Sequence, residues 1–232
     1  MSSASHMIRR RELLAGAGAF GLVVPILACA REPGAAARSP RLIAGATCPA
    51  TPRQTEGPFY FDPDLVRRDI AEGRPGAPLR LRLQVVAAAD CAPSRGARVD
   101  IWHCDADGVY SGYERERSTG ETFLRGTQFA DADGVAEFAT IYPGWYGGRA
   151  PHVHVKAWLD GGRELTSQIY FPDALSEQVY ALAAYAERDA RRRLRNADDG
   201  IFSRLGGRAP IAETARAGGG GGYDAAIVIA LS

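Results

Sequence analysis

The chain has 232 residues, of which 46% are apolar, and its 28 basic residues nearly balance its 27 acidic ones. This length is typical of one compact domain with a substantial core. A net charge of +1 provides none of the basic surface with which nucleic-acid-binding proteins neutralise phosphates, so we exclude nucleic acid as a partner.

Residues 1–28 have the pattern of an export signal. Arg9, Arg10 and Arg11 precede an uncharged stretch, residues 13–28, that is rich in Ala, Gly, Leu and Val. A basic region followed by a short apolar region is typical of signal peptides. The consecutive arginines resemble a twin-arginine signal, although an ordinary secretory signal fits equally well. We expect an exported protein, in the cell envelope or outside the cell, whose translation starts at Met1 or at Met7.

Cys29 allows two ways of processing this signal. Residues 26–29 (ILAC) resemble a lipobox, in which Cys29 becomes a lipidated first residue that anchors the protein to a membrane. The alternative is cleavage after residue 30, which discards the cysteine; we favour the lipoprotein. Residues 29–47 are rich in Ala, Gly, Arg and Pro and predict a flexible tether, which leaves residues 48–232 as the folded domain.

Three cysteines follow the signal and its lipobox. In an oxidising compartment, Cys48, Cys91 and Cys104 would form one disulfide and leave one thiol. Cys48 and Cys91 lie in proline-containing loop sequence, whereas Cys104 lies in a strand-like run. We therefore favour a Cys48–Cys91 disulfide.

The rest of the chain is mostly strand-like. Residues 79–85 alternate apolar and polar side chains, which predicts a strand with one face on a core. Further strand-like runs are residues 98–103, 135–141, 152–159, 165–171 and 223–231. Only residues 174–195 have a helical composition. The pattern predicts an all-β fold, a β-sandwich of mostly antiparallel strands with one short helix and long loops.

Two acidic tetrapeptides, residues 105–108 and 131–134, have the sequence DADG. Neither continues into the ligand series of a calcium loop. We predict that both form Asx-type turns, each ending in a glycine with positive φ.

Two histidines stand two residues apart in a predicted strand. His152 and His154 should therefore share one face, with Val153 and Val155 on the other. Paired imidazoles on a strand are a common half-site for a transition metal, although they could equally pack in a core or face solvent. Tyrosines near this pair in sequence outnumber thiols and carboxylates. A phenol binds a metal at neutral pH only when a strongly acidic cation, such as ferric iron, stabilises the phenolate.

Six short runs together resemble the intradiol ring-cleavage dioxygenases and occur in that family's order across residues 48–232. They are residues 55–60 (TEGPFY), 99–110 (VDIWHCDADGVY), 123–128 (FLRGTQ), 142–146 (YPGWY), 149–154 (RAPHVH) and 166–170 (TSQIY).

The resemblance implies one non-haem Fe(III) per chain, held by two tyrosinates and two histidines. By position, these ligands are Tyr110, Tyr146, His152 and His154. It also implies that Tyr146 helps to remove a catechol proton, and that the Arg149 guanidinium stabilises negative charge on the substrate. The residues implied to bind the substrate are Gly57, Pro58, Arg149 and Gln168, of which Gln168 matches a polar position either on the substrate side or directly behind the residues that contact the substrate. Tyr113 and Tyr142 fall outside the matching positions and are expected to be packing residues.

The implied reaction is cleavage of a catechol-type ring by O2 between its two hydroxylated carbons, giving a cis,cis-muconate-type dicarboxylate. Catechol and protocatechuate both fit as substrates. The alternative function is a surface β-sandwich module that binds aromatic compounds or carbohydrates without turnover. A ferrous cupin-like site would need a carboxylate and a third histidine, for which only His103 remains. The segment before Cys48 is too short for the helical dimerisation segment of the catechol branch, so we expect a monomer.

Overall fold

The computed structural model describes residue 42 and residues 47–159, 161–189, 193–218 and 221–232, all within one unit that spans residues 36–232. The predicted signal, Cys29 and most of the predicted tether lie outside the described residues. None of the helices in the described part of the chain is long and apolar enough to cross a membrane.

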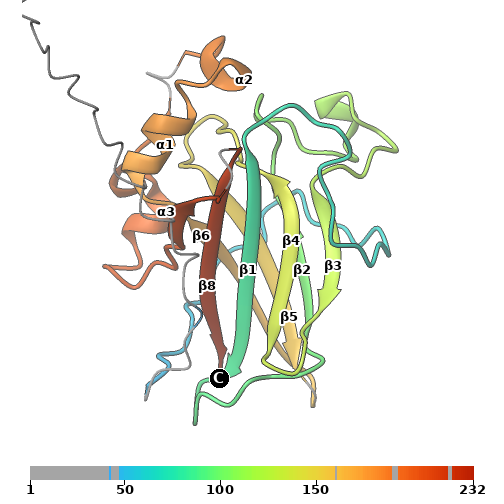
Figure 1. Ribbon diagram of the computed structural model, residues 1–232, viewed down its shortest axis with the longest axis vertical. Coiled ribbons are helices and arrows are strands. Elements are labelled where there is room, and N and C mark those ends of the chain that lie inside the picture. The colour runs from blue at the N-terminus through green and yellow to red at the C-terminus, as the bar shows by residue number, and fades with distance from the viewer. Residues whose placement is uncertain (1–41, 43–46, 160, 190–192, 219–220) are drawn as a thin grey trace, which may run out of the picture. The chain divides into compact units, whose positions relative to one another are not determined.

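Eight strands form two four-stranded sheets, with the orders β4-β1-β8-β7 and β3-β2-β5-β6. The strands are β1 (Pro78–Ala87), β2 (Arg98–Trp102), β3 (Arg125–Phe129), β4 (Val135–Ile141), β5 (His152–Leu159), β6 (Arg163–Tyr170), β7 (Glu213–Arg216) and β8 (Tyr223–Leu231). Neighbouring strands pair antiparallel, except that β1 and β8 are parallel. Figure 1 shows β1, β4 and β8 in front of β2 and β5. The predicted β-sandwich of mostly antiparallel strands is confirmed.

The core lies between the sheets and follows from period-two alternation. Leu79, Leu81 and Leu83 of β1 and Val153 and Val155 of β5 are buried in one cluster. Because β5 alternates, the side chains between these valines point to the opposite, outer face of the sheet. The two histidines therefore lie outside the sandwich core.

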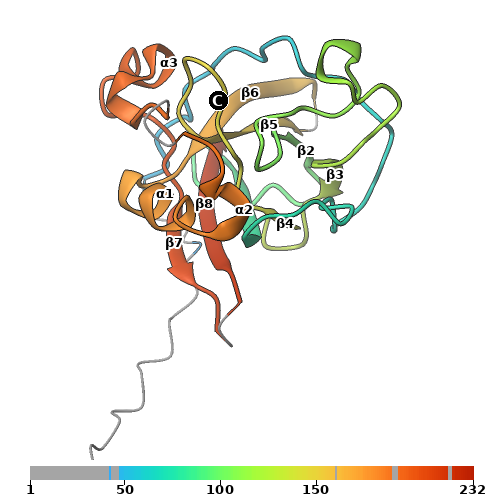
Figure 2. The same ribbon diagram turned by 90° about the horizontal axis from the view of Figure 1, so that it is seen from above.

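The sequence patterns missed two strands and overextended one helix. β3 has the sequence RGTQF, without apolar alternation, and β7 has only four residues. The predicted helix over 174–195 is not continuous, because α1 (Asp173–Val179) and α2 (Ala183–Ala186) are separate helices. The other helical elements are α3 (Gly200–Ser203) and the 3-10 turns Glu114–Glu116 and Asn196–Asp198. The hydroxyls of Tyr180 and Tyr185 donate to the carbonyls of Pro143 and Tyr142, so tertiary contacts shape this segment more than helix propensity does. Figure 2 shows α1 on the side of β7 and β8.

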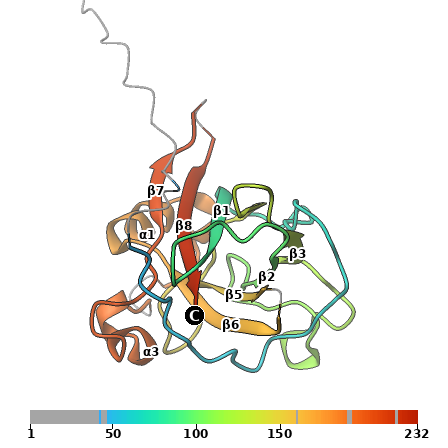
Figure 3. The same cartoon turned by 90° about the horizontal axis from the view of Figure 1, so that it is seen from below.

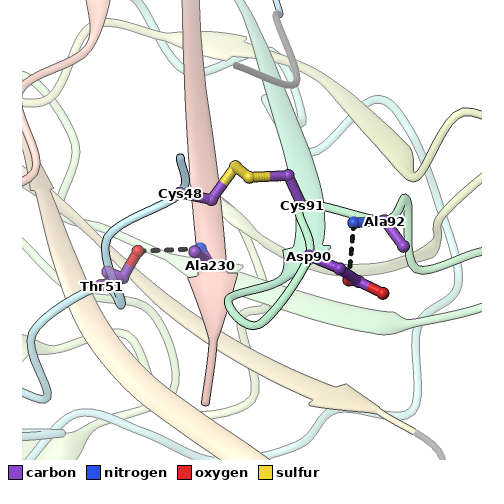
Figure 4. The surroundings of a disulfide bond; sticks show 6 residues. All are labelled: Cys48, Thr51, Asp90, Cys91, Ala92 and Ala230. Carbon is purple, nitrogen blue, oxygen red and sulfur yellow. Dashed lines mark hydrogen bonds between the residues drawn. A yellow bond between two sulfur atoms is a disulfide. The ribbon is translucent and has the colours of Figure 1, made fainter. Parts of the chain in front are cut away.

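Cys48 and Cys91 form a disulfide with Cα atoms 5.5 Å apart, which confirms the predicted pairing. Cys104 is free and buried. Figure 4 shows the disulfide and, beside it, the hydrogen bond in which the Ala230 backbone N–H donates to the Thr51 hydroxyl, 2.9 Å. After Thr51 the chain runs along the outside of the sheet β3-β2-β5-β6, past β6 and β5 (Figure 3). The backbone N–H of Gln54 in this segment donates to the Thr166 carbonyl of β6.

Both acidic tetrapeptides form the predicted turns. Asp105 Oδ1 accepts hydrogen bonds from the N–H groups of Asp107 and Val109, at 3.0 and 2.9 Å. Asp131 makes the equivalent pair of bonds in the second turn. Gly108 and Gly134 have φ angles of 85° and 74°, which glycine adopts without steric strain.

Candidate metal and active site

The candidate site lies on the outer face of the sheet β3-β2-β5-β6, where cross-strand register sets the neighbours. His154 of β5 lies opposite Trp102 of β2 and Gln168 of β6, and His152 lies opposite Tyr170. His152 and His154 are only 2% and 1% exposed. Loops therefore cover this face and enclose a polar site beside the core.

The two imidazoles converge on one point. The Nε2 atoms of His152 and His154 are 3.2 Å apart. The Nδ1–H of His152 donates to the Ala150 carbonyl, 2.7 Å away, so the Nε2 atom carries a lone pair that can accept a hydrogen bond or bind a metal ion. A backbone carbonyl that fixes the tautomer in this way is the usual partner of a metal-binding histidine. The ring of His154 stacks on Trp102, with centroids 4.8 Å apart.

Two tyrosines complete a group of four possible ligands. The Tyr146 hydroxyl lies 3.1 Å from Nε2 of His152, to which it donates. The Tyr110 ring is 5.6 Å from that of Tyr146 and 6.3 Å from that of His154. Its hydroxyl is buried and makes no hydrogen bond of normal geometry among the described residues, although it interacts with the Tyr146 hydroxyl. Since buried hydroxyls normally have a hydrogen-bond partner, this oxygen fits a place beside a metal ion.

Close backbone contact between two loops places these tyrosines. Gly108 lies in the turn before Tyr110, and a Cβ at this position would lie 2.3 Å from the Trp145 carbonyl oxygen. A Cβ at Gly144 would lie 2.4 Å from the Asp105 carbonyl oxygen. Side chains at either position would separate the two loops, so glycine is required for Tyr110 and Tyr146 to meet.

Burial adjusts the protonation of all four groups. Burial, together with Arg149, lowers the pKa of His152 to about 3, and burial lowers the pKa of His154 well below its usual range. Both imidazoles are therefore neutral at pH 7, the form that binds a metal. Burial raises the pKa of Tyr110 well above its usual range, and that of Tyr146 rises for the same reason. Both phenols stay protonated unless a strongly acidic cation stabilises the phenolate.

The Arg149 guanidinium connects the four-residue group to its surroundings. Nη1 donates to the Tyr146 hydroxyl at 3.3 Å, and Nη2 donates to Oε1 of Gln168 and, at 3.3 Å, to the Tyr170 hydroxyl. Nε donates to Asp199 at 2.9 Å. Every nitrogen of this cation is engaged, so its plane is fixed beside the histidines.

A pocket of about 490 Å³ opens onto this group, and its lining includes Gly57, Pro58, Tyr146, Arg149, His154 and Ile201. This volume lies within the usual range for small-molecule sites. Gly57, Pro58 and Arg149 line this pocket, and their contact with a substrate stays a prediction. Gln168 does not line it: it is fully buried, and its amide donates to the Thr55 carbonyl at 2.9 Å while its oxygen accepts from Arg149. It lies behind the arginine rather than in the lining.

The other predicted candidates stay in packing positions. His103 is buried and bonded to the Cys104 carbonyl and the Thr140 hydroxyl. The hydroxyl of Tyr142 pairs with Ser176, and that of Tyr113 donates to the Tyr60 carbonyl. In the described part of the chain, no three His, Cys, Asp or Glu side chains are grouped to hold a metal. No carboxylate joins the imidazole pair there, as a ferrous cupin-like site would require.

Three residues of the site were not assigned roles from sequence. Phe59 stacks on Tyr110, with centroids 4.2 Å apart. Tyr170 follows Gln168 by two residues on the same strand, so period-two geometry alone places it on the same face. Asp199 has no sequence signal, because its contact with Arg149 depends on where the chain around α3 docks.

Comparison with known proteins points to one family. A family model described as "Dioxygenase" matches residues 52–197. The solved structure of an intradiol ring-cleavage dioxygenase from Tetranychus urticae is 30% identical, with a TM-score of 0.75, over 80% of this chain and 95% of that chain. The dioxygenase domain of a dioxygenase carbohydrate-binding protein fusion from Streptomyces sp. SirexAA-E is 31% identical, with a TM-score of 0.58, over 79% of this chain and 99% of that chain.

Curated relatives agree, over a shorter stretch. Catechol 1,2-dioxygenase 1 of Acinetobacter lwoffii is 31% identical over 141 residues, which are 51% of this chain and 45% of that protein. The chain thus spans about half the length of the curated relatives that it matches. With the sandwich, the outer-face site and the matched stretch all in agreement, the chain belongs to the intradiol ring-cleavage dioxygenase family.

Proposed function

We propose that this protein is a non-haem iron enzyme that opens the ring of a catechol between its two hydroxylated carbons, using O2. Tyr110, Tyr146, His152 and His154 would hold one Fe(III) per chain. The product would be a cis,cis-muconate-type dicarboxylate.

The convergence of the four donor groups carries this proposal. Two neutral imidazole nitrogens lie 3.2 Å apart, and the Tyr146 hydroxyl lies 3.1 Å from one of them. The Tyr110 hydroxyl nearby is buried without a hydrogen bond of normal geometry. Two phenolic oxygens with two imidazoles suit a hard trivalent cation. A module that only binds aromatic compounds or carbohydrates has no use for four such donors on one point.

Bound ferric iron would supply a Lewis acid that binds the catechol oxygens and activates the ring for reaction with O2. The protein's own residues would prepare the substrate. Tyr146 lines the pocket, so its phenolate oxygen is placed to accept a proton from a catechol hydroxyl. Arg149 donates toward that same oxygen. A fixed cation there would stabilise the phenolate before this transfer and the negative charge that develops on the substrate afterwards.

The volume of the pocket, about 490 Å³, supports a substrate of catechol type but does not identify which catechol it is. Its lining combines the apolar side chains of Pro58, Phe59 and Ile201 with charges of both signs on Arg115 and Glu116. Catechol, protocatechuate and larger diphenols present the same two oxygens to a metal. Oxygen uptake with a panel of catechols, followed by the mass of each product, identifies the substrate, since insertion adds both atoms of O2.

The decisive test is the colour of the iron-loaded protein. Tyrosinate bound to ferric iron absorbs visible light by charge transfer, so we expect a burgundy-red protein containing one iron per chain. Tyr110→Phe and His154→Ala should each lose iron, colour and oxygen uptake, because each removes one donor.

Tyr113→Phe is the matched control. It removes a hydroxyl that donates to the Tyr60 carbonyl at 3.2 Å but leaves the four donors intact, so it should keep both iron and colour. A wild-type protein that is replete with iron yet colourless would refute the ligand assignment. Full activity in Tyr110→Phe would do the same.

We also propose that the protein is exported and acts as a monomer in the cell envelope or outside the cell. The Cys48–Cys91 disulfide supports an oxidising compartment. A lipid at Cys29 would anchor the protein to a membrane. Mass spectrometry of the mature N-terminus separates this form from a chain cleaved after residue 30, and sedimentation measures the oligomeric state.

A further inference from the structure

Asp199 is a fully buried carboxylate at the start of α3, and both of its oxygens are used. Oδ2 accepts hydrogen bonds from Nε of Arg149 and from the backbone N–H of Ala150, each 2.9 Å long. Oδ1 accepts from the N–H groups of Ile201 and Phe202, at 2.8 and 3.3 Å. The side chain is 0% exposed, so water does not replace any of these bonds.

These four bonds join three parts of the site. Arg149 is the cation beside the donor group. Ala150 carries the carbonyl that accepts from Nδ1 of His152. Ile201 lines the pocket. A single carboxylate therefore links the guanidinium, the support of one imidazole and a wall of the pocket.

The Nε anchor sets the plane of the guanidinium. A guanidinium is rigid and planar, so fixing Nε fixes the directions of both Nη groups. Nη1 then points to Tyr146 and Nη2 to Gln168 and Tyr170. Among the described residues, Asp199 is the only carboxylate within ion-pair distance of Arg149. The other partners of this arginine are neutral and hold it less firmly.

We propose that Asp199 is a positioning residue that orients Arg149 toward the bound substrate and couples that orientation to the pocket wall at Ile201. The inference rests on the proposed function, in which Arg149 acts on the catechol.

Asp199→Asn separates the two roles of the carboxylate. Asparagine is as good a helix N-cap as aspartate, so its oxygen can keep the bonds to Ile201 and Phe202. Its amide would then face two further donors, the N–H groups of Arg149 and Ala150. Asparagine has one acceptor oxygen where the carboxylate uses two, so the cap survives while the anchor of Arg149 is lost. Asp199→Ser, which also caps helices, removes the anchor without introducing an opposing donor.

Both variants should keep one iron per chain and the wild-type colour. Their kcat/KM for a catechol should fall roughly 10- to 100-fold, because a displacement of about 1 Å in a catalytic group costs rate on this scale. The loss should be mainly in kcat. In an Arg149→Lys background, Asp199→Asn should lower kcat/KM by less than about twofold further, since residues that act through each other are not additive.

Asp173→Asn is the matched control. Asp173 also accepts a backbone N–H, that of Asn196 at 3.1 Å, and lies 3.6 Å from Arg193. It begins α1 and contacts none of the site residues named above. Its kcat/KM should stay within about twofold of the wild type.

Exchange of the Arg149 Nε proton tests the anchor independently of turnover. In the metal-free protein, this N–H should be protected from exchange with solvent, because it is buried and hydrogen-bonded. Its NMR signal is assigned by its loss in Arg149→Lys. We expect exchange to be at least tenfold faster in Asp199→Asn and unchanged in Asp173→Asn.

Wild-type protection together with wild-type kcat/KM in Asp199→Asn and Asp199→Ser would overturn the inference. A fall in kcat/KM without faster exchange would overturn it too, as would faster exchange in an active enzyme with no fall in kcat/KM. If the wild-type protein turns over no catechol, the proposed function fails, and the exchange measurement still decides whether Asp199 anchors Arg149.

Discussion

Replacing both cysteines of the disulfide, Cys48→Ala with Cys91→Ala, should destabilise the protein without unfolding the site. The bond joins residues 43 positions apart and closes a loop that contains the pocket residues Gly57 and Pro58 as well as β1. Cys48 and Cys91 pack in a small apolar cluster with Val86 and Ala230. Alanine keeps this contact apolar, so the main change is the freedom of the unfolded chain.

The magnitude follows from the length of the loop. Closing a loop of 43 residues lowers the entropy of the unfolded chain by an amount worth about 4 kcal/mol at 25 °C. For a domain of this size, the midpoint of thermal unfolding should fall by about 8–16 °C, and that of urea unfolding by roughly 2 M. The folded segment keeps its two hydrogen bonds between Thr51 and Ala230, so the native structure should persist at 25 °C.

Urea unfolding of metal-free protein measures this difference. The double variant should unfold at the lower urea concentration, and reductant should bring the wild type to the same midpoint while leaving the variant unchanged. A shift below about 1 kcal/mol would refute the reasoning, because loop closure would then contribute little. The iron content of the folded variant should equal that of the wild type, since the four proposed ligands are untouched.

Three further variants test single positions. Burial lowers the pKa of His103 to about 4. Between pH 4 and the ordinary pKa of about 6.5, the unfolded chain therefore binds a proton that the folded chain excludes. The stability that is present above pH 6.5 is lost as the pH falls toward 4, by about 3 kcal/mol. In metal-free protein, His103→Gln should make that part of the stability–pH curve less steep without flattening it, because burial lowers the pKa values of His152 and His154 as well. An unchanged slope would contradict the assignment. Gly144→Ala should lower the free energy of unfolding by about 1–3 kcal/mol, because its Cβ would lie 2.4 Å from the Asp105 carbonyl oxygen. Gly147→Ala is the control, since a Cβ there meets no atom within 4 Å. Equal unfolding midpoints of the two variants would show that the loops can separate freely. Gly57→Ala should lower the free energy of unfolding by about 1–2 kcal/mol, because φ is +72° at this position. It should also raise KM, because the new Cβ would lie in the pocket, 3.5 Å from Cε1 of His154. An unchanged KM would place the substrate elsewhere.

The elements that could be predicted are those whose signal is local. β4 (Val135–Ile141) and β5 (His152–Leu159) have the predicted bounds, because period-two alternation against one core is visible in the residues themselves. The DADG turns follow from aspartate and glycine chemistry in the same way. β3 could not be recognised, since its Arg125 is buried on the outer face by hydrogen bonds to Ser111 and Phe59 rather than by apolar packing.

Among the proposed ligands too, some have a local sequence signal and others are brought together only by tertiary contacts. Spacing alone places His152 and His154 side by side, and the order of six short runs indicates the family. The tyrosines join the histidines only through close backbone contact of two loops at Gly108 and Gly144, which no local pattern reveals.

By itself, the sequence determined the sandwich, the disulfide partners and the residue types of the proposed ferric site, because these follow from periodicity, cysteine placement and recurring motifs. Only the tertiary structure decided that Gln168 stands behind Arg149 and that Asp199 anchors this arginine. Asp199 lies 50 residues from its partner, and hydrogen bonds over such distances depend on how the finished fold packs, which no short window of residues contains.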